Sequence, residues 1–406
     1  MNQLTFKVTP LIVALICVPA LVGLAQEPDD AELQELLGQP AAYAPPSAPM
    51  SSTATGISNT FNPAISVLGL MLGAGGAERS TRFSLQEFEL RFTSIIDPFL
   101  RADITIAFPG EGTAVEAENG EEAEPPVELE AAIITSTSVP QVTLQFGKYW
   151  LPFGKHNRLH THQFPFITPP LVIEQTFGGE ALNELALEAI PLLPTSFFSE
   201  LNLVMFQGDN DDLFLFEERA NPETGASETA AGPGKAKYLA HSKNLFELTD
   251  ASTLEAGLSY LTGLNNAGSG AATTVIGLDL TYKWRPLFAR GRSGAIVQFE
   301  WIDTTRETGE GDLRSSGYYL SGQWRFAEFW WGETRTGQFT ADVSDGAGAV
   351  EEQDSGHLDL LVAWVPTVFS AFRVQVSQIS TLGADPELFF FLQYSFSIGS
   401  HPAHTY

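Results

Sequence analysis

Long stretches of alternating apolar and polar side chains recur along this chain. The alternation is clearest near the C-terminus, where apolar and polar residues take turns over positions 390–398. A period of two places successive side chains on opposite faces of a β-strand. Soluble strands usually have about five or six residues, whereas a tilted strand that crosses a bilayer needs roughly nine to eleven. Because these stretches run for about ten to thirteen residues, they predict transmembrane strands.

About 16 stretches carry this pattern. One face of each stretch is suited to lipid and the other to water; in 276–284, for example, Ile276, Leu278 and Leu280 oppose Asp279 and Thr281. The predicted strands are 62–73, 82–96, 99–108, 127–138, 141–149, 184–193, 197–207, 239–249, 252–262, 272–284, 293–304, 315–327, 329–341, 356–366, 369–380 and 387–399.

Short and long connections alternate between these stretches. Tight turns are expected at Asp97-Pro98, Val139-Pro140, Pro194-Thr195, 249–251, Ala327-Glu328 and Pro366-Thr367, and long loops at 109–126, 150–183, 208–238, 305–314 and 342–355. Bacterial outer-membrane barrels have short periplasmic turns and long extracellular loops. The sequence therefore predicts an all-β fold, a transmembrane antiparallel β-barrel of about 16 strands with acidic extracellular loops.

Such a barrel belongs in the outer membrane of a Gram-negative cell. Its expected partners are outer-membrane lipid, lipopolysaccharide and the barrel assembly machinery, and the sequence does not define its oligomeric state. Aromatic residues gather beside several predicted turns, as in the interfacial girdles of such barrels. The alternative, an acidic soluble solenoid or sandwich, leaves long outward rows of apolar side chains unexplained.

The N-terminus has the pattern of a secretory signal peptide. Lys7 precedes an apolar run, and Gly23-Leu24-Ala25 offers small residues for cleavage after Ala25. We therefore expect residues 1–25 to be removed, 26–60 to form a periplasmic tail with a short helix and a proline-rich linker, and 61–406 to form the barrel. A retained N-terminal membrane helix is the alternative, although prolines interrupt the apolar run.

Charge and cysteine content narrow the function. The formal net charge is −28, and it becomes −29 without the signal peptide, which argues against a nucleic-acid partner. The single cysteine, Cys17, lies in the signal peptide. A mature chain without thiols excludes disulfides, thiol catalysis and cysteine-ligated metals.

Several short motifs resemble those of a known family. They are Asn62-Pro63-Ala64-Ile65-Ser66, Asp97-Pro98-Phe99-Leu100-Arg101-Ala102-Asp103, Gln145-Phe146-Gly147-Lys148, Phe153-Gly154-Lys155-His156-Asn157 and His160-Thr161-His162. In this order they resemble porin-like outer-membrane barrels that are often labelled zinc-regulated, TonB-dependent outer-membrane receptors. The Gly-Lys and Pro-Phe-Gly elements are also similar to phosphate-selective-type porins. This chain departs from the receptor label because only about 35 residues lie between the predicted cleavage after Ala25 and the first strand, which leaves no room for a lumen plug.

The predicted loop 150–183 is rich in basic and aromatic residues and prolines. Its five basic side chains are Lys155, His156, Arg158, His160 and His162. A 16-stranded barrel has a wide aqueous lumen, and an infolded loop is a means of narrowing it. We therefore expect this loop to fold inward and its basic residues to form the pore constriction, with imidazoles that make ion selectivity depend on pH.

His160 and His162 are candidate metal ligands. In an extended segment their side chains point to the same side and are suited to a shared metal such as zinc. The alternative is a loop whose imidazoles hydrogen-bond to carboxylates without metal, and no carboxylate lies close by in sequence. We expect no other cofactor.

Charges of both signs are predicted on the faces of the strands that line the lumen. They include Arg91, Arg101, Asp103, Glu333, Arg335 and Arg373, together with Glu87, Glu89, Glu128, Glu130, Asp279, Lys283, Glu300 and Arg325. Opposed acidic and basic walls orient water and favour polar solutes. The alternative is that these charges pair and stiffen an occluded lumen.

Three classes of function follow. The first is a porin or channel for small polar solutes or ions. The second is an outer-membrane receptor for uptake of a metal such as zinc, motivated by the histidines of the loop. An outer-membrane enzyme is the third class, and we expect none, because serine, histidine and acidic residues form no recognisable local motif.

Overall fold

The computed structural model describes residues 63–76, 79–110, 127–214, 236–267, 270–286, 293–308, 311–344 and 350–399. The predicted signal peptide, the N-terminal tail and most of the acidic loop sequences lie outside these residues. Among the described residues, no helix is both long and apolar enough to cross a membrane.

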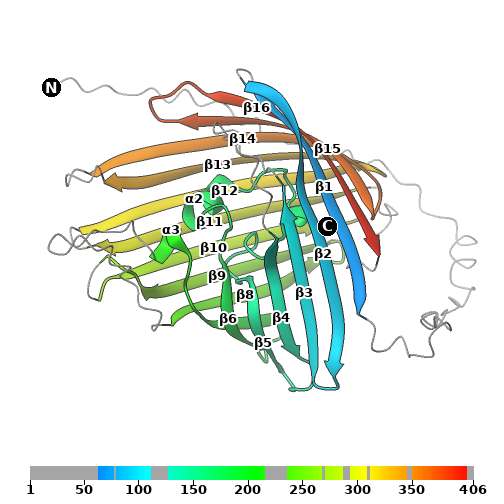
Figure 1. Ribbon diagram of the computed structural model, residues 1–406, viewed down its shortest axis with the longest axis vertical. Helices are drawn as coiled ribbons and strands as arrows, with labels where there is room; N and C mark the ends of the chain where they lie inside the picture. The colour runs from blue at the N-terminus through cyan, green and yellow to red at the C-terminus, as the bar shows by residue number, and fades with distance from the viewer. Residues whose placement is uncertain are drawn as a thin grey trace, which may run out of the picture. The chain divides into compact units, whose positions relative to one another are not determined.

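Sixteen strands form one closed antiparallel barrel (Figure 1). Each strand pairs with its neighbours in sequence, and the first pairs with the last to close the sheet. The predicted fold class is confirmed. The strands are β1 (Ala64–Gly76), β2 (Arg79–Asp97), β3 (Leu100–Pro109), β4 (Glu128–Ser136), β5 (Val142–Trp150), β6 (Asn183–Pro191), β7 (Phe198–Phe206), β8 (Lys237–Thr249), β9 (Ser252–Leu264), β10 (Ala272–Trp284), β11 (Gly294–Thr308), β12 (Gly311–Ala327), β13 (Trp330–Ser344), β14 (Val350–Thr367), β15 (Ser370–Thr381) and β16 (Glu387–Gly399).

The predicted tight turns lie together at one rim of the barrel, which we call the turn rim. In the first of them, Asp97 Oδ1 accepts hydrogen bonds from the backbone N–H groups of Phe99 (2.8 Å) and Leu100 (2.9 Å). An aspartate that bonds the backbone two residues ahead fixes a turn locally. The opposite rim, which carries the long connections, is the loop rim.

Two of the predicted long loops are wrong in extent. Segment 305–314 is mostly strand, since β11 runs to Thr308 and β12 begins at Gly311. Segment 342–355 is shortened in the same way, because β13 ends at Ser344 and β14 begins at Val350. Beyond the membrane a strand needs no apolar face, so the hydrogen-bonded ladder continues after the alternation has ended.

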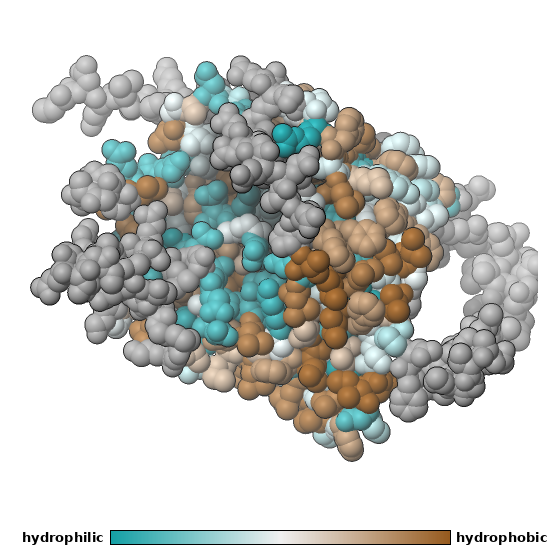
Figure 2. All heavy atoms as spheres, in the orientation of Figure 1, coloured by the Kyte–Doolittle hydropathy of each residue, from teal (hydrophilic) through white to brown (hydrophobic). Residues whose placement is uncertain are grey.

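The outer wall is apolar, as the alternation predicts. On β10, Leu278 is 38% exposed while the next residue, Asp279, is 2% exposed and faces inward. Figure 2 shows hydrophobic side chains gathered over a broad area of the surface. In a closed barrel every backbone group of the wall is paired, so such a wall is stable in hydrocarbon. The chain is an outer-membrane β-barrel.

Aromatic side chains form a contiguous band near the turn rim. Ring centroids are 6.4 Å apart between Trp330 and Trp364, 5.7 Å between Trp364 and Phe372, and 4.5 Å between Phe372 and Tyr394. This band agrees with an interfacial girdle. Tyr149, an aromatic residue near the end of β5, is not part of this band: it has the inward parity of β5 and is buried inside the barrel.

The inner wall is less uniformly polar than the alternation predicts. In the half nearest the loop rim, inward positions of β8 to β13 carry apolar side chains. These are Leu239, Leu261, Val275, Ile302, Tyr319 and Phe339, and all are buried. They pack against α2 (Leu171–Phe177) and α3 (Asp211–Phe214), which belong to the third and fourth loop-rim connections. A hydrophobic core therefore lies inside the barrel and holds two loops against its wall.

Candidate functional site

The candidate functional site is the loop 151–182 between β5 and β6. Asn157, which is 1% exposed, bridges the two ends of this loop. Its side-chain NH2 group donates hydrogen bonds to Leu151 O (2.8 Å) and Leu182 O (3.2 Å), and its Oδ1 accepts one from Leu182 N (2.9 Å). The loop contains a short 3-10 helix, η2 (Thr161–Gln163), and α2. This amide, together with the backbone hydrogen bond from Leu151 N to Leu182 O (2.9 Å), ties the two ends of the 32-residue segment to each other.

Apolar side chains hold the loop inside the barrel. Phe153 and Phe177 meet edge to face at 5.1 Å within the core described above. Farther along, Phe166 and Ile167 pack against inward residues of β1 and β14, including Leu72 and Leu361. These anchors lie on widely separated strands of the barrel (Figure 1), so the loop crosses the lumen.

Near the middle of the barrel, Glu300 of β11 binds the first part of the loop through hydrogen bonds. Its carboxylate accepts hydrogen bonds from Lys155 N (2.5 Å), His156 N (3.2 Å) and the hydroxyl of Tyr319 (2.5 Å). Gly154 makes this approach feasible: its φ is +59°, and a Cβ there would lie 2.1 Å from Glu300 Oε1. Only glycine adopts such a conformation with a carboxylate this close.

Lys155 and Arg158 pair with acidic residues on two different strands of the nearby wall. Lys155 Nζ lies 2.6 Å from Glu255 Oε1 on β9. Arg158 Nη2 lies 2.9 Å from Glu188 Oε1 on β6 and donates to Asn202 Oδ1 on β7 at 3.2 Å. Both side chains retain contact with water, so these two residues present charge to the lumen as the constriction hypothesis requires.

His156 does not fit the predicted role at a constriction. Its side chain is buried, with its ring 4.5 Å from the ring of Phe164 and 6.3 Å from that of Tyr319. Burial, with a smaller contribution from the charge of Arg335, lowers the pKa of His156 to about 3. A histidine that is neutral at physiological pH and shielded by aromatic rings contributes no charge to a pore.

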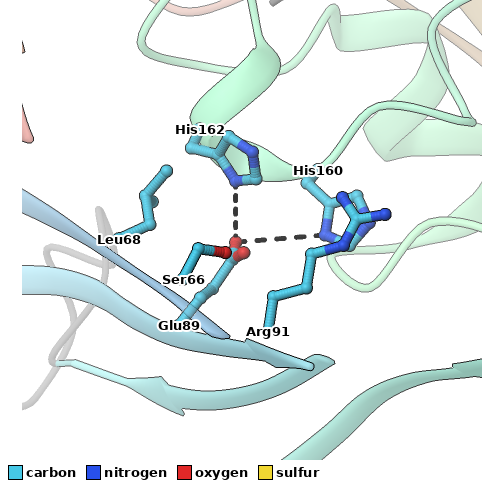
Figure 3. A pocket seen from close by; sticks show the side chains of 6 residues that line it. All are labelled: Ser66, Leu68, Glu89, Arg91, His160 and His162. Atoms are coloured by element: carbon cyan, nitrogen blue, oxygen red, sulfur yellow. Dashed lines mark hydrogen bonds and ion pairs between the residues drawn. The ribbon is translucent and has the colours of Figure 1, made fainter. Parts of the chain in front are cut away.

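His160 and His162 face carboxylates that are far away in sequence. His162 Nδ1 lies 2.9 Å from Glu89 Oε1 on β2 (Figure 3). His160 Nδ1 lies 3.9 Å from the same oxygen and 3.6 Å from Glu130 Oε2 on β4. Burial lowers the pKa of His160, but its interaction with Glu130 and the charges of Glu89 and Glu87 outweigh burial, and the pKa is raised.

Two arginines of the opposite wall clamp the second half of the loop. Arg335 on β13 donates to Thr168 O (2.8 Å) and Thr168 Oγ1 (2.9 Å) while its Nε pairs with Asp359 (2.8 Å). Arg373 on β15 donates to Phe164 O at 2.6 Å. These predicted lumen charges point inward, yet they serve to hold the loop and are almost completely buried.

The other predicted lumen charges divide into two groups. Arg91 and Arg101 both pair with Asp103, at 3.3 and 2.9 Å, near the turn rim and in contact with water. Glu333 on β13 lies deeper, and its Oε2 is buried without a hydrogen bond to any residue that the structure describes. Most of the predicted charges thus share the inner face, but only some line water.

The lumen ion pairs have a common asymmetry. Among the described residues, each water-accessible pair between an arginine or lysine and an acid has the basic side chain as its more exposed partner. The exposed fractions are 26% for Lys155 and 14% for Glu255, 37% for Arg158 and 0% for Glu188, 31% for Lys243 and 18% for Glu200, and 46% for Arg101 and 14% for Asp103. In these pairs the acids lie closer to the wall and the basic ends are the more accessible to water.

Sequence reasoning missed the residues that hold the loop. Asn157 stands in one of the motifs quoted above, and neither it nor Thr168, Glu188 or Glu255 is among the candidate site residues that the sequence predicts. The alternation gave a signal for Glu188 and Glu255, since both have inward parity on predicted strands. Their pairing with the loop depends on barrel closure, which brings β6 and β9 beside a segment that leaves the wall at β5.

The sequence comparisons do not establish a family. No family model matches the chain. An uncharacterized protein of Aquifex aeolicus (strain VF5) is 26% identical over 373 residues, which cover 84% of this chain and 75% of that protein.

Solved structures of similar architecture are outer-membrane porins and channels. The anion-selective porin of Comamonas acidovorans superimposes with a TM-score of 0.53 at 9% identity, covering 83% of this chain and 100% of that one. The channel DcaP of Acinetobacter baumannii gives 0.53 at 11% identity, with 84% and 99% covered. OprB of Pseudomonas putida gives 0.52 at 11%, with 83% and 94% covered. At such low identity the resemblance supports the fold: it agrees with the porin part of the motif resemblance and does not extend to the TonB-dependent receptor label.

Proposed function

We propose that this protein is a porin that passes small polar solutes and ions across the outer membrane, with a preference for anions. The observation that carries the proposal is the exposure of the basic partner in the lumen ion pairs around the loop 151–182. Field strength rises in a narrow and poorly solvated passage, so charges at the narrowest level outweigh more distant ones. The loop and its Lys155 and Arg158 form that level in this proposal.

The acidic loop sequences have a separate effect in this proposal. Segments 111–124 and 217–234 carry most of their charge as carboxylates, and solvated charge at a mouth acts mainly on the local ion concentration. We therefore assign entry rate to the acidic loops and selectivity to the basic lining.

A metal-uptake receptor is the less favoured candidate. The histidine and glutamate cluster around Glu89 is buried between the loop and β2, which suits an ion that stays rather than one that passes. A 16-stranded barrel whose lumen already holds a loop of its own also supports a channel better than a plugged receptor.

An enzyme is also less favoured. The barrel does place a serine beside a histidine, since His241 Nδ1 lies 2.8 Å from Ser259 Oγ. Ser259 is completely buried, and its hydroxyl accepts a hydrogen bond from Gly154 N (2.9 Å). A hydroxyl that anchors a loop and has no access to water is a poor nucleophile for an external substrate.

Planar-bilayer recording of the purified mature protein tests the proposal. Steady single-channel currents, together with swelling of protein-loaded liposomes in small polar solutes, are the expected result. Silent bilayers from protein that shows the heat-dependent gel shift of a folded barrel would contradict it.

A further inference from the structure

The cluster around Glu89 joins two histidines of the loop to a carboxylate of the wall. One ligand atom from each of Glu89, His160 and His162 lies within 4.8 Å of the other two. The two imidazole rings are 5.5 Å apart and tilted by 40°. Figure 3 shows both rings directed toward the Glu89 carboxylate. Nitrogen and oxygen donors from three side chains thus converge on one point.

Two more carboxylates border this point. Glu87 and Glu130 join Glu89 in a second group whose oxygens also lie within 4.8 Å of one another. Glu130 is 8% exposed, and its Oε2, which is 3.6 Å from His160 Nδ1, has no hydrogen-bond partner among the described residues. Oε1 of Glu87, which is 5% exposed, likewise has no hydrogen-bond partner among the described residues.

Three adjacent buried carboxylates repel one another and lack the solvation that water would give. The nearby Arg91 offers partial compensation only, because its Nη2 pairs with Asp103 at 3.3 Å. A divalent cation would bind the unpartnered oxygen of Glu130 directly and offset the negative charge of the neighbouring Glu87. Two imidazoles with carboxylate oxygens form a donor set that zinc accepts at about 2.0–2.2 Å, normally with four ligands.

We propose that Glu89, His160 and His162 bind a zinc ion inside the barrel, with a carboxylate oxygen of Glu130 as the fourth ligand. The contact between His162 Nδ1 and Glu89 Oε1 then gives way to two bonds to the metal. The ion fastens the 3-10 helix of the loop to β2 and β4, on the side of the lumen opposite the Arg335 clamp. This site is independent of the proposed porin function.

Metal binding by the full mature protein in detergent tests the site. After treatment with a chelator, zinc titration followed by elemental analysis should give one equivalent per chain. Zinc X-ray absorption of the loaded wild-type protein should show scattering from two imidazoles. Absence of a stoichiometric ion, or a spectrum without imidazole, overturns the proposal and leaves His160 paired with the glutamates without metal.

Variants locate the ion. Glu89→Gln and the double variant His160→Ala/His162→Ala should weaken zinc binding about 100-fold or more, since each removes direct ligands. His241→Ala is the matched control, because it removes another buried lumen histidine outside the cluster. Unchanged binding in folded ligand variants, or equal loss in the control, contradicts the assignment. Because metal content does not depend on conductance, a silent channel that binds zinc refutes only the porin proposal.

Discussion

Arg335 donates two hydrogen bonds to Thr168, a residue 167 positions earlier in the chain, through Nη1 to the backbone oxygen and through Nη2 to the hydroxyl. The same guanidinium pairs with Asp359, and both side chains are almost completely buried. The guanidinium group is planar, always charged and carries five N–H donors, so it can bond Asp359 and both oxygens of Thr168 at once. The far end of the loop is therefore positioned by the wall opposite its origin.

Loss of this arginine should release the loop and leave a buried charge. Arg335→Leu is expected to lower the free energy of unfolding by about 3–5 kcal/mol, because Asp359 loses its ion-pair partner. Single-channel current should become larger and noisier. The double variant Arg335→Leu/Asp359→Leu should recover much of the stability and keep the altered current. If the single variant conducts like the wild type, the clamp does not position the loop.

Gly154→Ala should displace the start of the loop from Glu300. The left-handed backbone alone costs an alanine roughly 1–2 kcal/mol, and the new Cβ meets the carboxylate oxygen. Gly179→Ala is the matched control in the same loop, since a Cβ there has no neighbour within 4 Å. Denaturant titration in detergent measures both variants. Equal midpoints would contradict the close approach of Gly154 to Glu300.

His156 should make the barrel sensitive to acid. Its pKa is about 3 in the folded protein and about 6.5 when unfolded, so the unfolded chain binds the extra proton below pH 6.5. Stability contributed by the neutral ring is complete above that pH and falls as pH decreases. Between pH 8 and pH 5 the expected loss is about 2 kcal/mol.

Denaturant titrations at both pH values check this expectation. Glu300, Arg335 and Tyr319 face His156 in both the wild type and the variant His156→Phe, so their effects cancel in the comparison. The variant should lose about 2 kcal/mol of the pH dependence. An identical pH dependence in the two proteins would show that the pKa of His156 is the same in the folded and unfolded chain, and would contradict its burial as a neutral ring.

Charge on the outer wall should be costly. Leu278 lies midway along β10 and faces lipid, so Leu278→Arg is expected to cost roughly 2–4 kcal/mol and to impair assembly. Leu278→Ala separates the effect of charge from the loss of the leucine. The heat-dependent gel shift reports assembly. Efficient assembly of the arginine variant would mean that the two faces of β10 have been exchanged.

The sequence predicted the barrel well because alternation is a local property. Each transmembrane stretch shows its two faces without reference to its neighbours, and the tight turns have their own signals, as at Asp97. The number of strands follows from these local features. The alternation did not predict the strand ends that extend beyond the membrane, as after residue 304. It also did not predict that inward residues such as Leu261 pack against a loop instead of meeting water.

The site was only partly predictable for the opposite reason. A run of basic residues between 155 and 162 indicated a special loop, and the five residues do lie inside the barrel. Which of them meet water depends on partners that barrel closure supplies: Glu89 from β2 buries His162, and Tyr319 from β12 covers His156. No local pattern in the loop contains that information.

The central claim is that water in the lumen meets the basic end of each ion pair around the loop. The reversal potential of the purified protein in a steep KCl gradient tests it most directly. We predict a value displaced toward the chloride equilibrium potential, reduced by Lys155→Gln/Lys243→Gln, and unchanged by Arg314→Gln, which removes an exposed charge from the outside of β12. A wild-type reversal potential on the potassium side, or an equal shift in the control, would contradict the account.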